Sequence, residues 1–125
     1  MRKIVVVSMV VGTLLILGAK APLRADEKGG QKDVTLTGEI VDTHCYATMG
    51  ARGASHRECG LACAKAGIPV GLLEAKTNKL YVLLPDSDKK PVPAAAIQKM
   101  GETAKIRGHV YEVGGSRFLT VEAVE

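Results

Sequence analysis

The 125-residue sequence contains no tryptophan and only one phenylalanine, and aromatic residues make up 3% of it. A core built from this composition must therefore be aliphatic. Binding of single-stranded nucleic acid is disfavoured, because it depends on aromatic side chains that stack on the bases and on basic strand faces. The sequence also has no internal repeat, phosphate-binding loop, Ser-His-Asp arrangement or pair of catalytic carboxylates. These absences favour a binding or interaction role over an enzymatic one.

The N-terminal segment has the features of an export signal. Residues 1–3 give a short basic start, and residues 4–18 form an apolar stretch interrupted only by Ser8 and Thr13. This stretch is too short to span a bilayer comfortably. Ala25 is a small residue at the predicted cleavage position, so we expect a signal peptide over residues 1–25 and a periplasmic or secreted protein. The alternative is an uncleaved signal, which would be the only attachment to a membrane.

Most of the excess positive charge lies in this predicted signal. The whole sequence has 17 Lys and Arg residues against 13 Asp and Glu, a formal net charge of +4. Residues 1–25 hold four of these cations and no acidic residue, so the remaining 100 residues are formally neutral. A neutral domain lacks the basic surface that nucleic acids and acidic membranes attract. We therefore expect no nucleic-acid partner, and the sequence does not indicate a protein partner.

The rest of the chain predicts one small mainly β domain over residues 34–125, after a flexible lead-in at 26–33. Short apolar runs and the alternation of apolar and polar residues predict five strands, at 34–41, 70–74, 80–84, 103–113 and 117–124, with a helix at 94–100 before the fourth strand. This order is typical of the OB-fold, a five-stranded Greek-key barrel. Gly38 and Gly108 lie in mid-strand and suit the sharp coiling of such a barrel. The alternative is an open antiparallel sheet with two helices on one face.

An insert at residues 43–69, after the first strand, holds all three cysteines. Ser55 and Glu58 match a capping box, and Gly67 is a helix stop, which together predict a helix over residues 56–66. Cys59 and Cys63 are then four residues apart, and His56 precedes Cys59 by three. At about 100° per residue these three side chains share one stripe of the helix.

A third sulfur comes from Cys45, which follows the first strand directly. Together with His56, Cys59 and Cys63 it forms a Cys3His set, which suits a soft or borderline metal such as Zn or Cu(I). His44 could replace His56 as the nitrogen ligand, and Asp42 could orient either histidine. Two alternatives stay open. One is a disulfide from Cys45 to Cys59 or Cys63 that pins the insert to the barrel, and the other is thiol redox chemistry with Cys59 as the reactive thiolate.

Two further kinds of side chain are candidates of lower rank. His109 lies on the polar face of the fourth predicted strand, where a histidine is most often simply solvated. Met49 and Met100 could offer thioether sulfur to copper, although single methionines usually pack in cores. We therefore keep the cysteine set as the predicted site.

The spacing of the insert resembles a known pattern. Asp42-x-x-Cys45-Tyr46, His56-x-x-Cys59-x-x-x-Cys63 and Gly67-x-Pro69 followed by Gly71-Leu72-Leu73 are similar to small exported bacterial OB-fold-like domains of unknown function that carry a cysteine-bearing insert after the first strand. The resemblance covers residues 40–84. It implies that the cysteine set is a family site, and it implies no activity.

Overall fold

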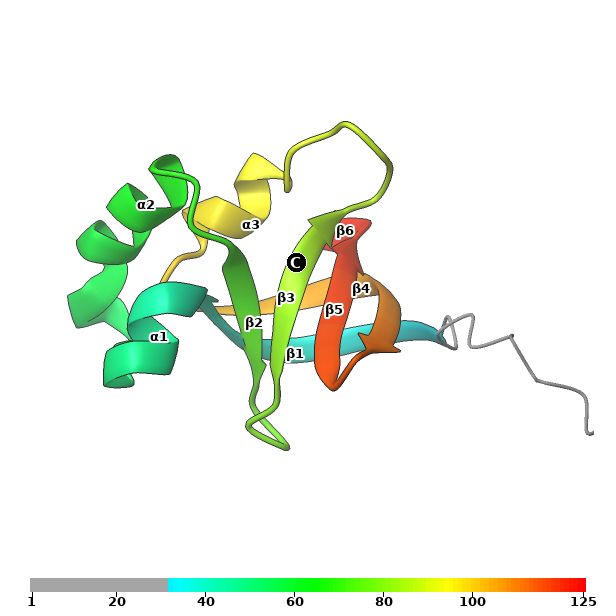
Figure 1. The fold of residues 1–125 in the computed structure, drawn as a ribbon, viewed down its shortest axis with the longest axis horizontal. Helices are drawn as coiled ribbons and strands as arrows, with labels where there is room; N and C mark the ends of the chain where they lie inside the picture. Colours follow the sequence, from blue (N-terminus) through cyan, green and yellow to red (C-terminus); the bar gives the residue numbers. More distant parts are fainter. Residues whose placement is uncertain (1–31) are drawn as a thin grey trace, which may run out of the picture.

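Five strands close into a barrel in the computed structural model, which describes residues 32–125 (Figure 1). The elements in chain order are β1 (Lys32–Asp42), α1 (Thr43–Met49), a short 3-10 helix η1 (Ala54–His56), α2 (Arg57–Lys65), β2 (Val70–Glu74), β3 (Leu80–Pro85), α3 (Ala94–Gln98), β4 (Thr103–Val113), β5 (Ser116–Val121) and β6 (Ala123–Val124). The prediction of a mainly β chain with a barrel and a helical insert after the first strand is confirmed. The predicted signal, residues 1–25, lies outside the described residues. Within residues 32–125, no helix is long and apolar enough to cross a membrane.

The barrel closes because β1 has partners on both of its edges. Residues 38–42 pair with β2 and residues 32–39 pair with β4, both antiparallel. The circuit continues from β2 to β3, then through a parallel pairing of β3 with β5, and back to β4. The alternative of an open sheet is therefore wrong. Lys32 and Asp33, expected in the flexible lead-in, belong to β1 and pair with Val110 and His109.

Two glycines allow the strands to approach one another at the closure points. A Cβ added to Gly38 would collide with the backbone carbonyl of Leu73, and one added to Gly108 would collide with that of Thr120. Gly38 is also the residue at which β1 faces Glu74 of β2 and Ala104 of β4 at the same register. The prediction that both glycines serve strand coiling agrees with these contacts.

The core is aliphatic, as the composition requires. The largest fully buried apolar side chains are Ile40, Leu72, Met100, Ile106, Leu119, Val41 and Val121. The α3 helix ends at Gln98 rather than at the predicted residue 100, and Met100 instead forms an isolated parallel bridge with Ile40. Met100 is 1% exposed. Met100 therefore packs in the core, as single methionines usually do.

The last predicted strand is interrupted at Glu122, which separates β5 from β6. The pairing of β4 with this segment shifts by one residue between the Val110–Leu119 pair and the Arg107–Ala123 pair. One extra residue on one strand is a β-bulge, which bends and twists the strand. This bend occurs where the backbone of Thr120 lies close to Gly108. The alternation of apolar residues in the sequence does not predict the bulge.

Candidate metal centre

Asp42 joins the barrel to the first helix of the insert. It is the last residue of β1 and the N-cap of α1, where its Oδ1 accepts a hydrogen bond from the backbone N–H of Cys45 at 2.8 Å. Asp is a preferred N-cap because it satisfies a free amide of the first turn. The helix ends at Gly50 in a left-handed conformation (φ 67°) whose N–H donates to Tyr46. Cys45 is thus fixed in the first turn of α1, directly against the barrel.

The α1 helix was not predicted from the sequence. The signal for it was present: Asp42 and Gly50 bound a seven-residue segment with the two residue types that favour helix ends. The run of alanine, glycine and threonine in this region is equally typical of a loop. Cys45 therefore follows the first strand as predicted, but it lies in a helix that was not predicted.

The second helix begins differently from the prediction. Ser55 lies in η1, His56 occupies the N-cap position of α2, and no side-chain hydrogen bond caps this helix. The predicted capping box of Ser55 and Glu58 is therefore wrong. A tertiary contact replaces it, because the His56 ring bonds instead to Asp42 on the barrel. The predicted range of 56–66 is otherwise close to the observed Arg57–Lys65.

Gly60 lets α2 lie close to the barrel. It is buried, and a Cβ added there would stand 2.7 Å from Met100 Sδ and 3.5 Å from Asp42 Oδ2. A normal Cβ contact is longer than the first of these distances, so any larger residue must push α2 or Met100 aside. The approach of α2 to the Asp42 end of β1 therefore depends on a residue that the cysteine spacing alone does not single out.

Arg57 fixes the start of α2 to the segment around α3. Its guanidinium donates to the carbonyl oxygens of Met100 at 2.8 Å and Gln98 at 2.7 Å, and to Glu102 Oε1 at 2.7 Å. A planar guanidinium with several donors suits such a cluster of acceptors. This positioning role of Arg57 was not predicted from the sequence.

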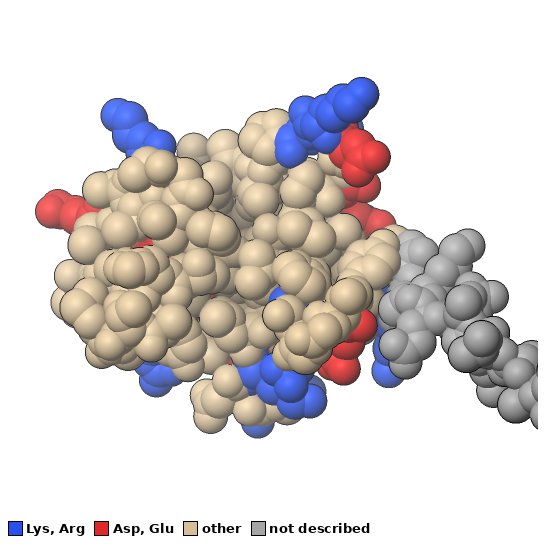
Figure 2. All heavy atoms as spheres, viewed as in Figure 1, with Lys and Arg blue, Asp and Glu red and all other residues tan. Residues whose placement is uncertain are grey.

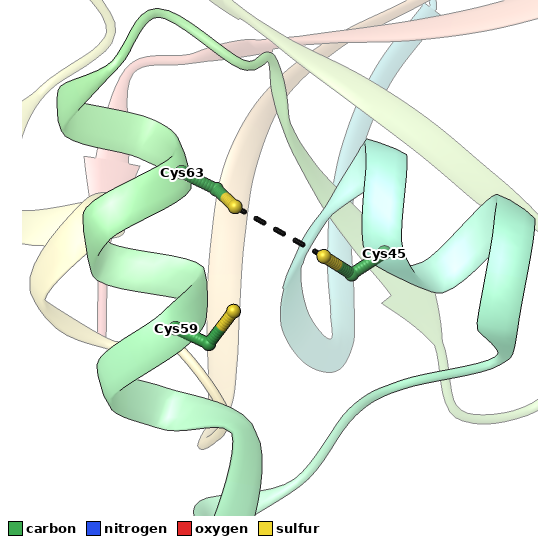
Figure 3. A group of neighbouring side chains, drawn as sticks. All are labelled: Cys45, Cys59 and Cys63. Carbon is green, nitrogen blue, oxygen red and sulfur yellow. Dashed lines mark hydrogen bonds between the residues drawn. The ribbon is translucent and has the colours of Figure 1, made fainter.

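The three cysteine sulfurs converge between α1 and α2. Figure 3 shows Cys59 and Cys63 pointing from α2 toward Cys45 on α1. The Sγ atoms of Cys45 and Cys63 are 3.9 Å apart, and the three sulfurs all lie within 4.8 Å of one another. None of the three cysteines is in a disulfide. The predicted alignment of Cys59 and Cys63 on one stripe, facing a third cysteine, agrees with this geometry.

His56 belongs to a second group that shares Cys45 with the first. Its Nε2 lies 2.8 Å from Asp42 Oδ2, and the ligand atoms of Asp42, Cys45 and His56 are within 4.8 Å of one another. The side chain of His56 is 16% exposed and that of Asp42 is fully buried. Asp42 thus orients His56, one of the two histidines for which this role was expected. His44 is exposed and, among residues 32–125, belongs to neither group.

The charge of Asp42 shapes the electrostatics of the site. Burial alone would disfavour its ionised form, but the backbone N–H of Cys45 and the ring of His56 outweigh burial and hold the pKa of Asp42 below its ordinary value. Burial and hydrogen bonds to Asp42 and Cys63 raise the pKa of Cys45 to about 12. Burial is also the largest cause of the raised pKa of Cys63. The carboxylate of Asp42 disfavours thiolates at the neighbouring cysteines, because like charges repel. A cation bound between these groups would stabilise both the carboxylate and the thiolates.

His109, the histidine outside the insert, has two acidic partners rather than a simply solvated ring. Its Nε2 lies 2.6 Å from Asp33 Oδ1 and its Nδ1 lies 3.0 Å from Glu122 Oε1. The two carboxylates stand on opposite sides of the imidazole, so this arrangement ties β1 and the bulge to β4 and offers no shared pocket for an ion. It is a structural contact.

Comparison with known proteins gives no match for this chain, whether with family models, with curated proteins or with solved structures. The resemblance to exported bacterial domains therefore stays a prediction.

Proposed function

We propose that this domain binds one soft metal ion, Zn(II) or Cu(I), through the thiolates of Cys45, Cys59 and Cys63. The observation that carries the proposal is the convergence of three sulfurs from two helices within 4.8 Å. A tetrahedral Zn–S distance of about 2.3 Å places two sulfur ligands about 3.8 Å apart. The Cys45–Cys63 separation of 3.9 Å is close to that spacing. Thiolates select such ions over Mg²⁺ and Ca²⁺, which prefer oxygen ligands.

In this proposal His56 becomes the fourth ligand when the ion is Zn(II), and its ring must then move toward Cys59 and Cys63, because in this structure it groups only with Asp42 and Cys45. The bond between its Nε2 and Asp42 leaves Nδ1 as the nitrogen that can bind an ion. Histidines that bind metals typically donate their other N–H to a carboxylate in this way. Structural zinc sites almost always have four ligands, so Zn(II) needs this nitrogen. Soft thiolate ligands also suit Cu(I), so the sulfur set is the part of the site that both ions share.

Titration of Zn(II) and Cu(I) into the reduced protein, followed by competition with a chromophoric chelator and by native mass spectrometry, tests the proposal. We expect one ion per chain. Cys63→Ser should weaken the binding of both ions, and His56→Ala should weaken Zn(II) in particular. The matched control is His44→Ala, which removes an exposed neighbouring imidazole and should leave both affinities unchanged. A reduced parent protein that binds neither ion would end the proposal.

A disulfide between Cys45 and Cys63 is the second candidate use of the site, favoured by their 3.9 Å sulfur separation. It would staple α2 to α1 and leave Cys59 as a free thiol. Under non-reducing conditions the intact mass would then fall by the mass of two hydrogen atoms, with no metal bound. A Cys45→Ser variant compared with the oxidised parent should lose about 2–4 kcal/mol of stability. Equal stability would exclude the staple.

We further propose that the barrel is of the OB type and that the chain is exported. The strand circuit, the parallel pairing of β3 with β5, and α3 between β3 and β4 support the first proposal. The basic start and apolar stretch of residues 1–18 support the second. Expression in a bacterial host tests the export directly. Protein recovered from the periplasm should lack residues 1–25, and a full-length chain that remains with the membrane fraction would contradict cleavage.

A further inference from the structure

We propose that the site passes its metal ion to an incoming thiolate of an acceptor molecule, and that Cys59 is the ligand that this thiolate replaces. The inference rests on the proposed metal binding and adds that the ion is transferred from this protein to an acceptor. Metal delivery differs from storage because one coordination position must be open to exchange while the others hold the ion. The three cysteines differ in a way that meets this condition.

The exposure of the three thiols is graded. Cys45 is 5% exposed, Cys63 is half-buried and Cys59 is exposed. An incoming ligand can reach an ion in the site only from the exposed side, which is the side of Cys59. A closed structural site would instead surround the ion with buried ligands. The asymmetry therefore separates a retaining pair, Cys45 and Cys63, from an exchangeable ligand.

The three thiols also differ in their place in the site. Cys45 is fixed to the end of β1 by the Asp42 cap, and Cys63 approaches it at 3.9 Å. Cys59 lies one helical turn away from Cys63, nearer the start of α2. The exposed Cys59 is therefore the sulfur that can leave the ion while Cys45 and Cys63 hold it.

The surface around the two helices permits close approach. The α1 helix contains no charged residue, and Figure 2 shows the lobe formed by α1 and α2 as mostly uncharged on the visible face. Exposed positions near the cysteines include the small residues Ala47, Thr48 and Ala62, together with Met49 and Glu58. A partner that presents a cysteine on an uncharged surface therefore meets little like-charge repulsion here.

The exchange step balances without any redox change. The acceptor thiol loses its proton to solvent and its sulfur bonds to the ion. The bond between the ion and Cys59 breaks, and the freed Cys59 thiolate takes up a proton. The metal keeps its oxidation state throughout, so no oxidant or reductant is needed. A second thiolate of the acceptor can then replace one retaining sulfur. The other retaining sulfur then leaves a Cu(I) ion that two acceptor thiolates hold, and both freed protein thiolates take up protons.

The test uses Cu(I)-loaded protein, an uncharged synthetic peptide with one cysteine as the acceptor, and iodoacetamide followed by peptide mass mapping. Without peptide, all three protein cysteines should resist alkylation because their thiolates are bound. With increasing peptide, Cys59 alone should lose its protection while native mass spectrometry detects a complex of protein, ion and peptide. Glutathione in place of the peptide distinguishes the sources: equal rates assign the exchange to thiolates in general, and faster exchange with the peptide assigns it to protein-borne thiols.

The outcomes separate this inference from the proposed function. Failure of the protein to load with Cu(I) or Zn(II) would refute the metal site itself. A loaded protein in which Cys45 or Cys63 is alkylated first, or in which protection is lost at a rate independent of peptide concentration, would overturn the exchange at Cys59 and leave the metal site intact.

Discussion

Replacement of Gly60 by alanine should destabilise the protein although alanine favours helices. Two effects oppose each other at this position. Alanine in place of glycine inside a helix stabilises by about 1 kcal/mol. The added methyl group would stand 2.7 Å from Met100 Sδ and 2.8 Å from Met100 Cγ, and Met100 is almost fully buried. Such overpacking costs about 1–3 kcal/mol. We therefore expect Gly60→Ala to lower the free energy of unfolding by up to about 2 kcal/mol.

The same change should weaken metal binding, because α2 carries two of the three proposed thiolates and must move outward or displace Met100. Urea unfolding of the reduced, metal-free protein, followed by circular dichroism, measures the stability term. Ala62→Gly is the matched control, since it exposes the helix-propensity difference alone at a solvent-facing position of α2. If Gly60→Ala proves more stable than the parent by the amount that Ala62→Gly loses, α2 has room at this position and the close approach described above is refuted.

Three further predictions concern charge. Zn(II) binding should release protons, because the raised pKa of Cys45 keeps that thiol protonated before the ion binds; calorimetry in buffers of different ionisation enthalpy measures the number, and a buffer-independent enthalpy would contradict it. The lowered pKa of Asp42 adds stability that is present above the ordinary aspartate pKa of about 3.9 and is lost as pH falls through the folded value. Acid unfolding monitored by circular dichroism should therefore show a smaller loss of stability between pH 5 and pH 3 in Asp42→Asn than in the parent. Equal losses would mean that the acid sensitivity comes from other residues. Arg57→Ala should cost about 1.5–3 kcal/mol through its bonds to two backbone carbonyls, whereas the control Arg52→Ala, which removes an exposed ion pair at 4.0 Å, should cost less than about 1 kcal/mol in the same urea assay.

The strands could be predicted because their sequence patterns are local. The hairpin of β2 and β3 follows from two short apolar runs and the turn between residues 74 and 80, and the long β4 strand follows from apolar residues at every second position. The bulge at Glu122 depends instead on how β4 meets β5 around Gly108, which is a property of two distant segments. Periodicity in one segment carries no information about that register.

The grouping of the cysteines was predictable from residue type and helical spacing, and the residues that support this grouping were not. The spacing of Cys59 and Cys63 on one helix, together with Cys45 after the first strand, was sufficient to predict the sulfur group. The local capping motif of Ser55 was overruled because the contact of His56 with Asp42 determines how α2 begins. Gly60 and Arg57 act through groups around Met100, about 40 residues later in the chain. Sequence spacing within the insert cannot indicate such partners.

The double pairing of β1 also has a kinetic consequence. Its second partner is β4, and the residues that pair there, such as Leu36 and Ile106, are 70 positions apart. Pairings this distant form slowly, because the intervening chain must lose its freedom before the contact stabilises anything. Asp42, which positions Cys45, is the last residue of that same strand. The three thiols are therefore in an unfolded part of the chain until the barrel closes. An oxidant present during that time can react with any of the three cysteines, because the fold has not yet buried Cys45. Refolding under reducing conditions, before metal is added, is the order of events that this topology favours.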